Sequence, residues 1–111
     1  MLRFKDFLRK GDFRVPICTT CRETIWPPFE TCPICLSRTT FRRTSKKGIL
    51  REFSTTFTSE TPQQFGIIDL GGVHLLGSVQ GYDISLGCKV ILYECGIDNN
   101  GYPFYKFRKC P

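Results

Sequence analysis

Two closely spaced cysteine pairs constrain the fold of this chain most strongly. Cys18 and Cys21 form the first pair, Cys32 and Cys35 form the second, and ten residues separate the pairs. Two residues between cysteines let the backbone turn so that both sulfurs point to one centre, and two such knuckles supply four tetrahedral thiolate ligands. The spacing therefore predicts a metal site with four cysteine ligands.

We expect the metal to be one structural Zn²⁺ ion per chain. A rubredoxin-like iron centre would use the same ligands, but rubredoxin-type knuckles usually place glycine soon after the second cysteine, where this chain has Arg22 and Leu36. Four protein ligands leave no position for water or substrate, so the ion is expected to stabilise a small lobe rather than to catalyse a reaction. An electron carrier with iron in the site is a further hypothesis.

The remaining reactive residue types do not form a catalytic arrangement. Cys88, Cys95 and Cys110 are scattered, and each is expected to be a small buried side chain or a tail thiol. His74 is the only histidine, and it lies in an apolar run without a neighbouring nucleophile. A chain of 111 residues is also short for most folds that enclose a deep substrate pocket. We therefore predict that the protein is not an enzyme.

Positive charge is concentrated in the first half of the chain. The formal net charge is +6, and residues 1–53 hold 12 Lys/Arg against 5 Asp/Glu. Most of this excess lies in a stretch without any acidic residue. Its basic residues are Arg38, Arg42, Arg43, Lys46, Lys47 and Arg51. Such a field attracts phosphates or an acidic protein face, although a solvated loop that aids solubility is the simpler interpretation.

The N-terminal residues predict a short amphipathic helix. Over residues 2–10, Phe4, Phe7 and Leu8 recur at helical spacing, and Gly11 could cap the end. So short a helix must dock, either on its own metal lobe or on a partner. Trp26 and Phe29, between the cysteine pairs, could likewise cover the site or contact a partner.

From Gly48 onward the sequence predicts a small barrel of short strands. The expected strands are 49–57, Phe65–Leu70, Val73–Val79, Val90–Ile97 and Tyr102–Arg108, with a hairpin turn at Gly71-Gly72. Five short strands with glycines at the corners fit an OB-fold. We thus expect a mainly β protein with a helix over 1–11, a rubredoxin-like zinc ribbon and basic linker over 12–47, and a five-stranded OB-fold barrel over 48–111. Alternation along the first strand places Ile49 and Phe53 on the same face of that strand. Alternation along the fourth strand places Ile91 and Tyr93 on the same face of that strand.

The order of these features resembles a known family. The helix and first knuckle are followed by Trp26-Pro27-Pro28 and by a Cys-Pro-x-Cys knuckle, and Gly48-x-Leu50 enters a strand rich in Phe and Ser/Thr. Ile-Asp-Leu-Gly-Gly, Leu-Leu-Gly, Leu-Gly-x-x-Val and a closing Tyr-x-Phe-Arg come next. Together they resemble the zinc-ribbon plus OB-fold family called domain of unknown function 35, which is associated with acyl-CoA metabolism.

The resemblance implies a non-catalytic role beside an enzyme that acts on CoA esters. It implies that the four cysteines hold zinc, that helix and ribbon dock on a thiolase and/or a hydroxymethylglutaryl-CoA synthase, and that the barrel lies near bound CoA. The docking residues would be Phe4, Phe7, Leu8, Trp26 and Phe29. One departure is Phe29: the family often has arginine after the two prolines, so a contact made by that arginine is not expected in this chain.

The functional hypothesis is a scaffold that binds a thiolase-type enzyme and assists the binding or transfer of an acyl-CoA intermediate. CoA carries phosphates that Arg42, Arg43, Lys46 and Lys47 could meet with charge-assisted hydrogen bonds, and its adenine could stack on Phe53, Tyr82 or Tyr102. The alternative is a protein that binds single-stranded nucleic acid, which the slightly acidic second half disfavours. No run approaches the roughly 20 apolar residues of a membrane span and no secretory signal is present, so a cytoplasmic protein is expected.

Overall fold

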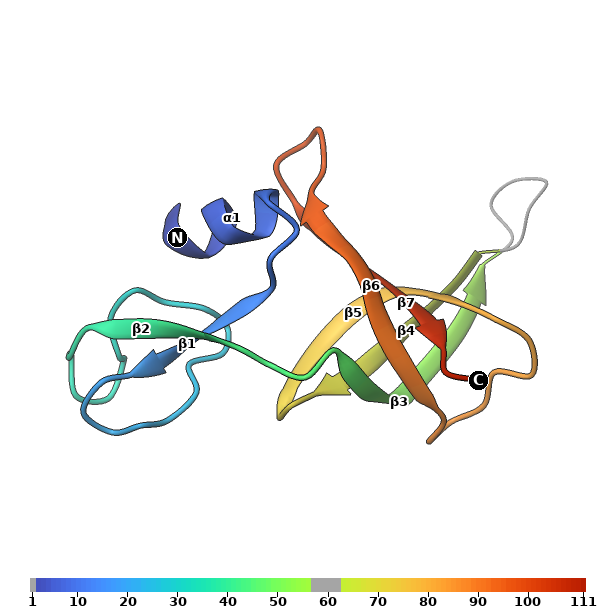
Figure 1. Cartoon of the computed structure of the whole chain (residues 1–111), viewed down its shortest axis with the longest axis horizontal. Coiled ribbons are helices and arrows are strands. Elements are labelled where there is room, and N and C mark those ends of the chain that lie inside the picture. Colours follow the sequence, from blue (N-terminus) through green and yellow to red (C-terminus); the bar gives the residue numbers. More distant parts are fainter. Residues whose placement is uncertain (1, 57–62) are drawn as a thin grey trace. The chain divides into compact units, whose positions relative to one another are not determined.

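In its described residues the protein is mainly β with one short helix, as the sequence predicted. A computed structural model describes residues 2–56 and 63–111, so Phe57 of the predicted first barrel strand lies outside the described residues. Figure 1 shows the elements in chain order. They are α1 (Leu2–Arg9), β1 (Arg14–Cys18), β2 (Thr39–Arg43), β3 (Lys47–Thr56), β4 (Gln63–Leu70), β5 (Val73–Gln80), β6 (Lys89–Ile97) and β7 (Pro103–Lys109).

The chain divides into two compact units. The first comprises residues 1–44 and 96–103, and we call it the ribbon unit. The second comprises residues 45–95 and 104–111, and we call it the barrel unit. The domain boundaries expected from the sequence, after residues 11 and 47, stay a prediction.

Helix α1 packs on its own lobe through an aromatic cluster. The Phe4 ring lies 6.4 Å from the Phe13 ring and 5.6 Å from the Trp26 ring, both edge-on, and Leu8 is fully buried. The Phe7 ring lies 5.3 Å from that of Phe41 in β2, which pairs antiparallel with β1. Since short helices gain stability mainly from packing, these contacts explain why eight residues suffice for this helix.

A glycine ends the helix, as predicted. Gly11 has a φ of 74°, its amide donates to the carbonyl of Leu8, and the Asp12 amide donates to the carbonyl of Phe7. This pair of bonds is the Schellman arrangement, in which the residue after the cap must be left-handed and is therefore usually glycine.

Asp12 anchors the start of β1 to the end of β2. Its carboxylate accepts hydrogen bonds from Arg14 at 2.8 Å and from Arg43 at 3.0 and 3.2 Å. The bonds from Arg43 and Arg14 hold the pKa of the Asp12 carboxyl below its usual value of 3.8. Of the basic residues near the end of the predicted ribbon and linker segment, Arg42 and Arg43 belong to β2, and Lys47 begins β3.

We expect Asp12→Asn to destabilise the protein by about 1 kcal/mol at pH 7, because Asp12 loses charge-assisted bonds to partly exposed arginines. A carboxyl whose pKa is lower when folded stabilises the fold above its unfolded pKa and loses that effect as the pH falls through the folded value. The difference in Tm between wild type and variant should hold down to about pH 4 and close below it. Both proteins keep the same cysteines, so metal loss in acid affects them equally. An undiminished difference at pH 3 would contradict the assignment.

The barrel unit has the strand order of an OB-fold, which confirms the predicted fold class. The strands form a closed barrel in the order β3-β4-β5-β7-β6. The pairs β3–β4, β3–β6 and β4–β5 are antiparallel, and β5–β7 is parallel. Fully buried side chains fill the interior, including Leu50, Ile68, Leu70, Val90 and Phe107. Gly71 and Gly72 join β4 to β5 with φ of 61° and 93°, as the hairpin prediction required.

A β-bulge overturns the predicted face of β3. Leu50 pairs with Ile68 and Glu52 pairs with Ile67, so Arg51 is an extra residue on β3. Ile49 and Phe53 pair with Asp69 and Gly66, which have opposite orientations on β4, and the two were wrongly expected on one face. In β6 the buried residues at the start are Val90 and Leu92, so the interior side is not that of Ile91 and Tyr93.

Candidate functional site

Four cysteine sulfurs lie close enough together to hold one metal ion. Cys18 ends β1, and the sulfurs of Cys18, Cys21, Cys32 and Cys35 all lie within 4.8 Å of one another. The Sγ atom of Cys35 is 3.4 Å from that of Cys18 and 3.3 Å from that of Cys21. A tetrahedral Zn²⁺ site with Zn–S bonds of about 2.3 Å needs sulfurs roughly 3.8 Å apart. The donor set and its spacing therefore fit such an ion.

The two knuckles have the same backbone geometry. The amide of Arg22 donates to the Cys18 carbonyl at 3.0 Å, and the amide of Leu36 donates to the Cys32 carbonyl at 2.9 Å. Arg22 and Leu36 have φ of 64° and 61°, so two non-glycine residues occupy the left-handed region. The Cys21 amide also points to the Cys18 sulfur at 3.2 Å, which favours the thiolate that a metal requires.

The cysteines differ in how readily they lose a proton. Hydrogen bonds from the Ser37 hydroxyl and backbone amide lower the pKa of Cys35 to about 6. The pKa of Cys21 is raised to about 12, mainly by the hydrogen bond of Cys21 with Cys35 and secondly by its hydrogen bond with Cys18. A bound metal ion takes all four residues as thiolates, so binding releases protons and weakens in acid.

Leu36→Gly is expected to stabilise the knuckle by up to about 1 kcal/mol. The left-handed conformation costs a residue with a side chain about 1–2 kcal/mol, and glycine avoids this cost. Glycine loses more backbone entropy on folding, and this loss offsets part of the gain. Leu36 is 76% exposed, so little packing is lost. The measurement is the Tm together with metal retention against a competing chelator. Ile34→Gly is the control, because Ile34 is 79% exposed without a positive φ, and it should lower the Tm. An equal decrease in the Tm of both variants would contradict backbone strain at Leu36.

Four of the five expected docking residues are buried or half-buried in the structure. Phe4 and Leu8 are buried in the ribbon unit, and this corrects the expectation that they would face a partner. Phe7 and Trp26 are half-buried, and Phe29 alone of the five is exposed, at 52%. Sequence reasoning missed Ile34 and Leu36, the exposed side chains that flank Cys35.

The four basic residues expected to meet phosphates belong to different units. Arg42 and Arg43 lie in the ribbon unit, where Arg42 donates to the Thr24 hydroxyl at 3.3 Å and Arg43 is bonded to Asp12. Lys46 and Lys47 lie at the start of the barrel unit. Because Arg43 already shares its charge with a carboxylate, Arg42, Lys46 and Lys47 are the better candidates for an anion.

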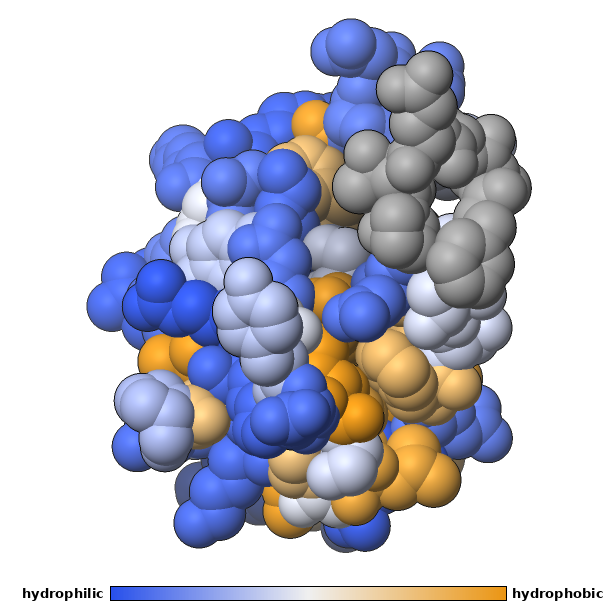
Figure 2. Space-filling view, turned by 90° about the vertical axis from the view of Figure 1, so that its right-hand side faces the viewer, coloured by the Kyte–Doolittle hydropathy of each residue, from blue (hydrophilic) through white to orange (hydrophobic). Residues whose placement is uncertain are grey.

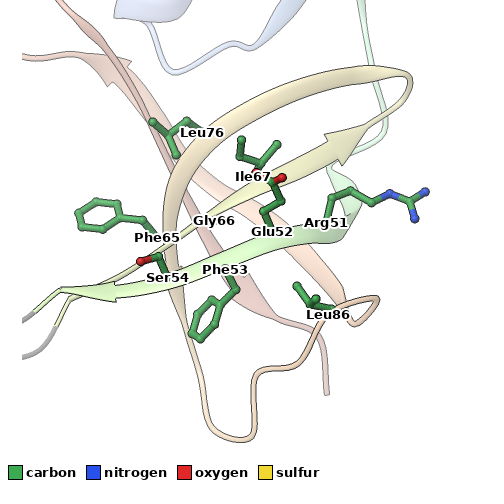
Figure 3. A pocket seen from close by; sticks show the side chains of 9 residues that line it. All are labelled: Arg51, Glu52, Phe53, Ser54, Phe65, Gly66, Ile67, Leu76 and Leu86. Atoms are coloured by element: carbon green, nitrogen blue, oxygen red, sulfur yellow. The ribbon is translucent and has the colours of Figure 1, made fainter.

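Two open grooves on the barrel unit were not foreseen. The first has a volume of about 590 Å³ and is lined by Arg51, Glu52, Phe53, Ser54, Phe65, Gly66, Ile67, Leu76 and Leu86 (Figure 3). The second has a volume of about 910 Å³ and is lined by Gln63, Gln64, Phe65, Ser78, Val79, Gln80, Gly81, Tyr82 and Lys106. Figure 2 shows apolar side chains in the middle and lower part of the face that it presents, with hydrophilic ones around them.

The single histidine and the three scattered cysteines form no second site in the described residues. His74 is exposed on β5, Cys95 is buried, and Cys88 and Cys110 are half-buried. Of the proposed stacking aromatics, Tyr82 is 92% exposed and lines the second groove, whereas Phe53 lines the first. Tyr102 is exposed in the turn between β6 and β7.

Comparison with known proteins identifies the fold. No protein-family model and no curated protein matches the chain in sequence. Among solved structures, an Ltp2–ChsH2(DUF35) aldolase matches with a TM-score of 0.77 and 18% identity, over 96% of this chain and 91% of that chain. A protein of unknown function from the DUF35 family of Sulfolobus solfataricus matches with a TM-score of 0.68 and 13% identity, over 97% and 83%. The chain has the DUF35 fold.

This finding confirms the resemblance drawn from the sequence at the level of the fold. Both DUF35 structures align with the chain almost from end to end, so the match includes the ribbon as well as the barrel. Within the described residues of this DUF35-like chain, no helix is long and apolar enough to cross a membrane.

Proposed function

We propose that the protein is a non-catalytic accessory subunit of a thiolase-type enzyme that acts on acyl-CoA esters. The observation that carries the proposal is the end-to-end match to a structure whose name pairs Ltp2 with ChsH2(DUF35) in an aldolase. The partner would be a thiolase and/or a hydroxymethylglutaryl-CoA synthase, as the family resemblance implies. The chain would bind this enzyme and assist the binding or transfer of an acyl-CoA intermediate.

The metal centre fits a supporting role in this proposal. Cys18, Cys21, Cys32 and Cys35 would hold one Zn²⁺, which supplies folding energy that the small ribbon unit lacks. With four protein ligands the ion has no open position for a substrate. The surface of the ribbon unit, including Phe29, would then be available for the partner enzyme.

Lys46 and Lys47 at the start of the barrel unit would meet the phosphates of CoA, and Arg42 of the ribbon unit is a further candidate. Among the described residues, Lys46 and Lys47 show no side-chain partner, and the side chain of Arg42 makes one hydrogen bond, to a hydroxyl. Ammonium and guanidinium groups bind phosphate through charge-assisted hydrogen bonds. These cations would retain the CoA ester while the partner enzyme carries out its reaction.

The experiment combines the purified protein with a thiolase-type enzyme from the same source. We expect one complex in size-exclusion chromatography, no turnover by the protein alone, and a lower KM of the enzyme for its CoA ester in the complex. Lys46→Ala/Lys47→Ala should raise that KM while leaving the complex intact. Lys5→Ala/Lys10→Ala, which removes one lysine from α1 and one from the turn after it, is the matched control. Absence of a complex, together with unaltered kinetics, would overturn the proposal.

A further inference from the structure

Strand β3 has an open edge beyond its bulge. On one side it pairs with β4 from Ile49 to Thr56. On the other side it pairs with β6 only over Lys47–Ile49, and Leu50 then exchanges hydrogen bonds of 3.0 and 2.8 Å with the loop before β6. Within the part of the chain that the structure describes, no strand pairs with this second side over residues 51–56. The barrel is therefore closed by a short contact, and the second half of β3 remains an edge.

The bulge determines which backbone groups face the open side. Along an antiparallel ladder every second residue directs its N–H and C=O away from the partner strand. Leu50 does so, because its amide and carbonyl bond to the loop before β6. The extra residue Arg51 shifts the alternation by one, so the next residues of this kind are Phe53 and Thr55. Among the described residues, the amides and carbonyls of these two have no backbone partner.

The first groove of the barrel unit runs over this edge. It is lined by four consecutive residues of β3, from Arg51 to Ser54, and by Leu86 of the loop before β6. Successive side chains of a strand point to opposite faces, so a groove that touches four in a row passes around the strand edge. Figure 3 shows Phe53 and Leu86 on one side of β3, and Glu52 and Ile67 on the other. The groove thus offers an added strand contacts on both of its faces.

The sequence of the edge does not block pairing. Natural proteins protect free edges with lysine, proline or a bulge, or cover them with another segment. The bulge lies at the start of this edge, and residues 52–56 contain neither lysine nor proline. Phe53 and Thr55 are half-buried, so their unpaired backbone groups are only partly solvated. Pairing with an extended chain would therefore satisfy them.

The side chains at the edge indicate what such a chain carries. Glu52 is exposed and has no hydrogen bond or ion pair in the described ranges. A strand that pairs with β3 places one of its side chains directly beside Glu52, where lysine or arginine is favoured. On the opposite face, Phe53 and the 66% exposed Leu86 favour apolar side chains. A segment of alternating apolar and basic residues matches this pattern.

A second copy of this chain matches the edge less well. Its own edge, residues 51–56, carries one cation, Arg51. A guanidinium nitrogen of Arg51 already lies 3.6 Å from a carboxylate oxygen of Asp69. Pairing of two identical edges would therefore bring no free cation to Glu52.

We propose that the open edge of β3 binds an extended peptide segment of a partner protein by strand addition. A basic side chain of the segment lies beside Glu52, and apolar side chains lie against Phe53 and Leu86. In this mode the backbone bonds hold the peptide and the side-chain contacts select its sequence. The inference does not depend on the proposed function, because the unpaired backbone and the charge of the edge carry it.

The test titrates a short capped peptide of alternating valine and lysine into the full chain. In the free protein we expect the amides of Phe53 and Thr55 to exchange hydrogen rapidly, and that of Ser54, which bonds to β4, to exchange slowly. The peptide should protect Phe53 and Thr55 and leave Ser54 as it was. By calorimetry, the same peptide with glutamate in place of lysine should bind about tenfold more weakly, because attraction to Glu52 becomes repulsion.

Two variants separate the backbone contribution from the charge contribution. Thr55→Pro removes an N–H that points to the open side and keeps the ladder with β4, so it should abolish peptide binding. Glu52→Lys should reverse the preference, so that the glutamate peptide binds more tightly than the lysine peptide. Glu94→Lys is the matched control, because Glu94 is exposed on β6 and lines neither groove, and it should keep the preference for lysine. The charge reversal keeps the proposal testable should Thr55→Pro not fold.

Three results would overturn the inference. The first is that neither peptide binds below about 1 mM, and the second is binding that leaves hydrogen exchange at Phe53 and Thr55 unchanged. The third is protection of these amides that rises with protein concentration alone, together with a dimer in sedimentation, which would assign the edge to a second copy of the chain. The accessory function is tested separately by the enzyme complex, so it stands or falls independently of these results.

Discussion

Replacing Cys32 by serine is expected to abolish metal binding and to unfold the ribbon unit. Cys32 is fully buried, and its sulfur belongs to the four-cysteine cluster. A serine hydroxyl does not replace a thiolate as a zinc ligand, and structural zinc contributes apparent binding energies of about 10–16 kcal/mol to zinc-finger peptides. The buried cluster around these sulfurs is small, with Ile25 packed against Cys18 and Cys32, so we expect the unit to lose its fold rather than to loosen.

Trp26 makes this loss measurable. It is the only tryptophan, and it packs on Phe4 and Phe13 within the ribbon unit. Its fluorescence and near-ultraviolet circular dichroism should change in Cys32→Ser to those of a solvated indole, and the metal content should fall from one ion per chain to none. Cys110→Ser, which removes a cysteine outside the cluster, should keep both signals. A metal-free wild-type protein with a native Trp26 signal would contradict the structural role of the ion.

Truncation of Phe107 is the second large effect that we expect. Phe107 is fully buried in β7, and its ring lies directly over Gly77 of β5. A Cβ atom at Gly77 would come within 2.8 Å of this ring and within 2.6 Å of the Tyr105 carbonyl oxygen, so the strands are closely packed here. Phe107→Ala should therefore leave a cavity and cost about 3–5 kcal/mol.

Urea unfolding, followed by far-ultraviolet circular dichroism, measures this cost. The midpoint should fall strongly for Phe107→Ala, whereas Phe29→Ala, which truncates a 52% exposed phenylalanine, should change it little. Because Trp26 lies in the ribbon unit, its signal shows whether that unit unfolds together with the barrel. A loss below about 1 kcal/mol for Phe107→Ala would contradict the packing described here.

Local sequence signals predicted the elements that depend on local geometry. The C-x2-C spacing located the cysteine cluster, Gly11 located the helix end, and Gly71-Gly72 located the hairpin. In each case a short segment determines the backbone, because a knuckle or a left-handed glycine needs only its immediate neighbours. The order of strands in the barrel followed from the OB-fold resemblance rather than from such signals.

Features that depend on distant segments were not predictable in the same way. The bulge at Arg51 has no glycine or other local mark, yet it shifts the faces of β3 by one residue. The spacing of Phe4 and Leu8 in the sequence is the same whether the helix packs on the ribbon or on a partner. The packing of Phe4 on Phe13 and Trp26 in the structure decides for the ribbon. The grooves combine residues of β3, β4 and β5 that become neighbours through strand register alone.

The most direct test of the accessory function is affinity purification of the tagged protein from its native, nuclease-treated cell extract, with identification of bound proteins by mass spectrometry. We predict that the metal-loaded wild-type protein recovers a thiolase or a hydroxymethylglutaryl-CoA synthase in stoichiometric amount. The Phe107→Ala variant and the metal-free protein should not retain this enzyme. Recovery of ribosomal or transcription proteins without any CoA-dependent enzyme would contradict the proposal and would favour a protein that binds nucleic acid.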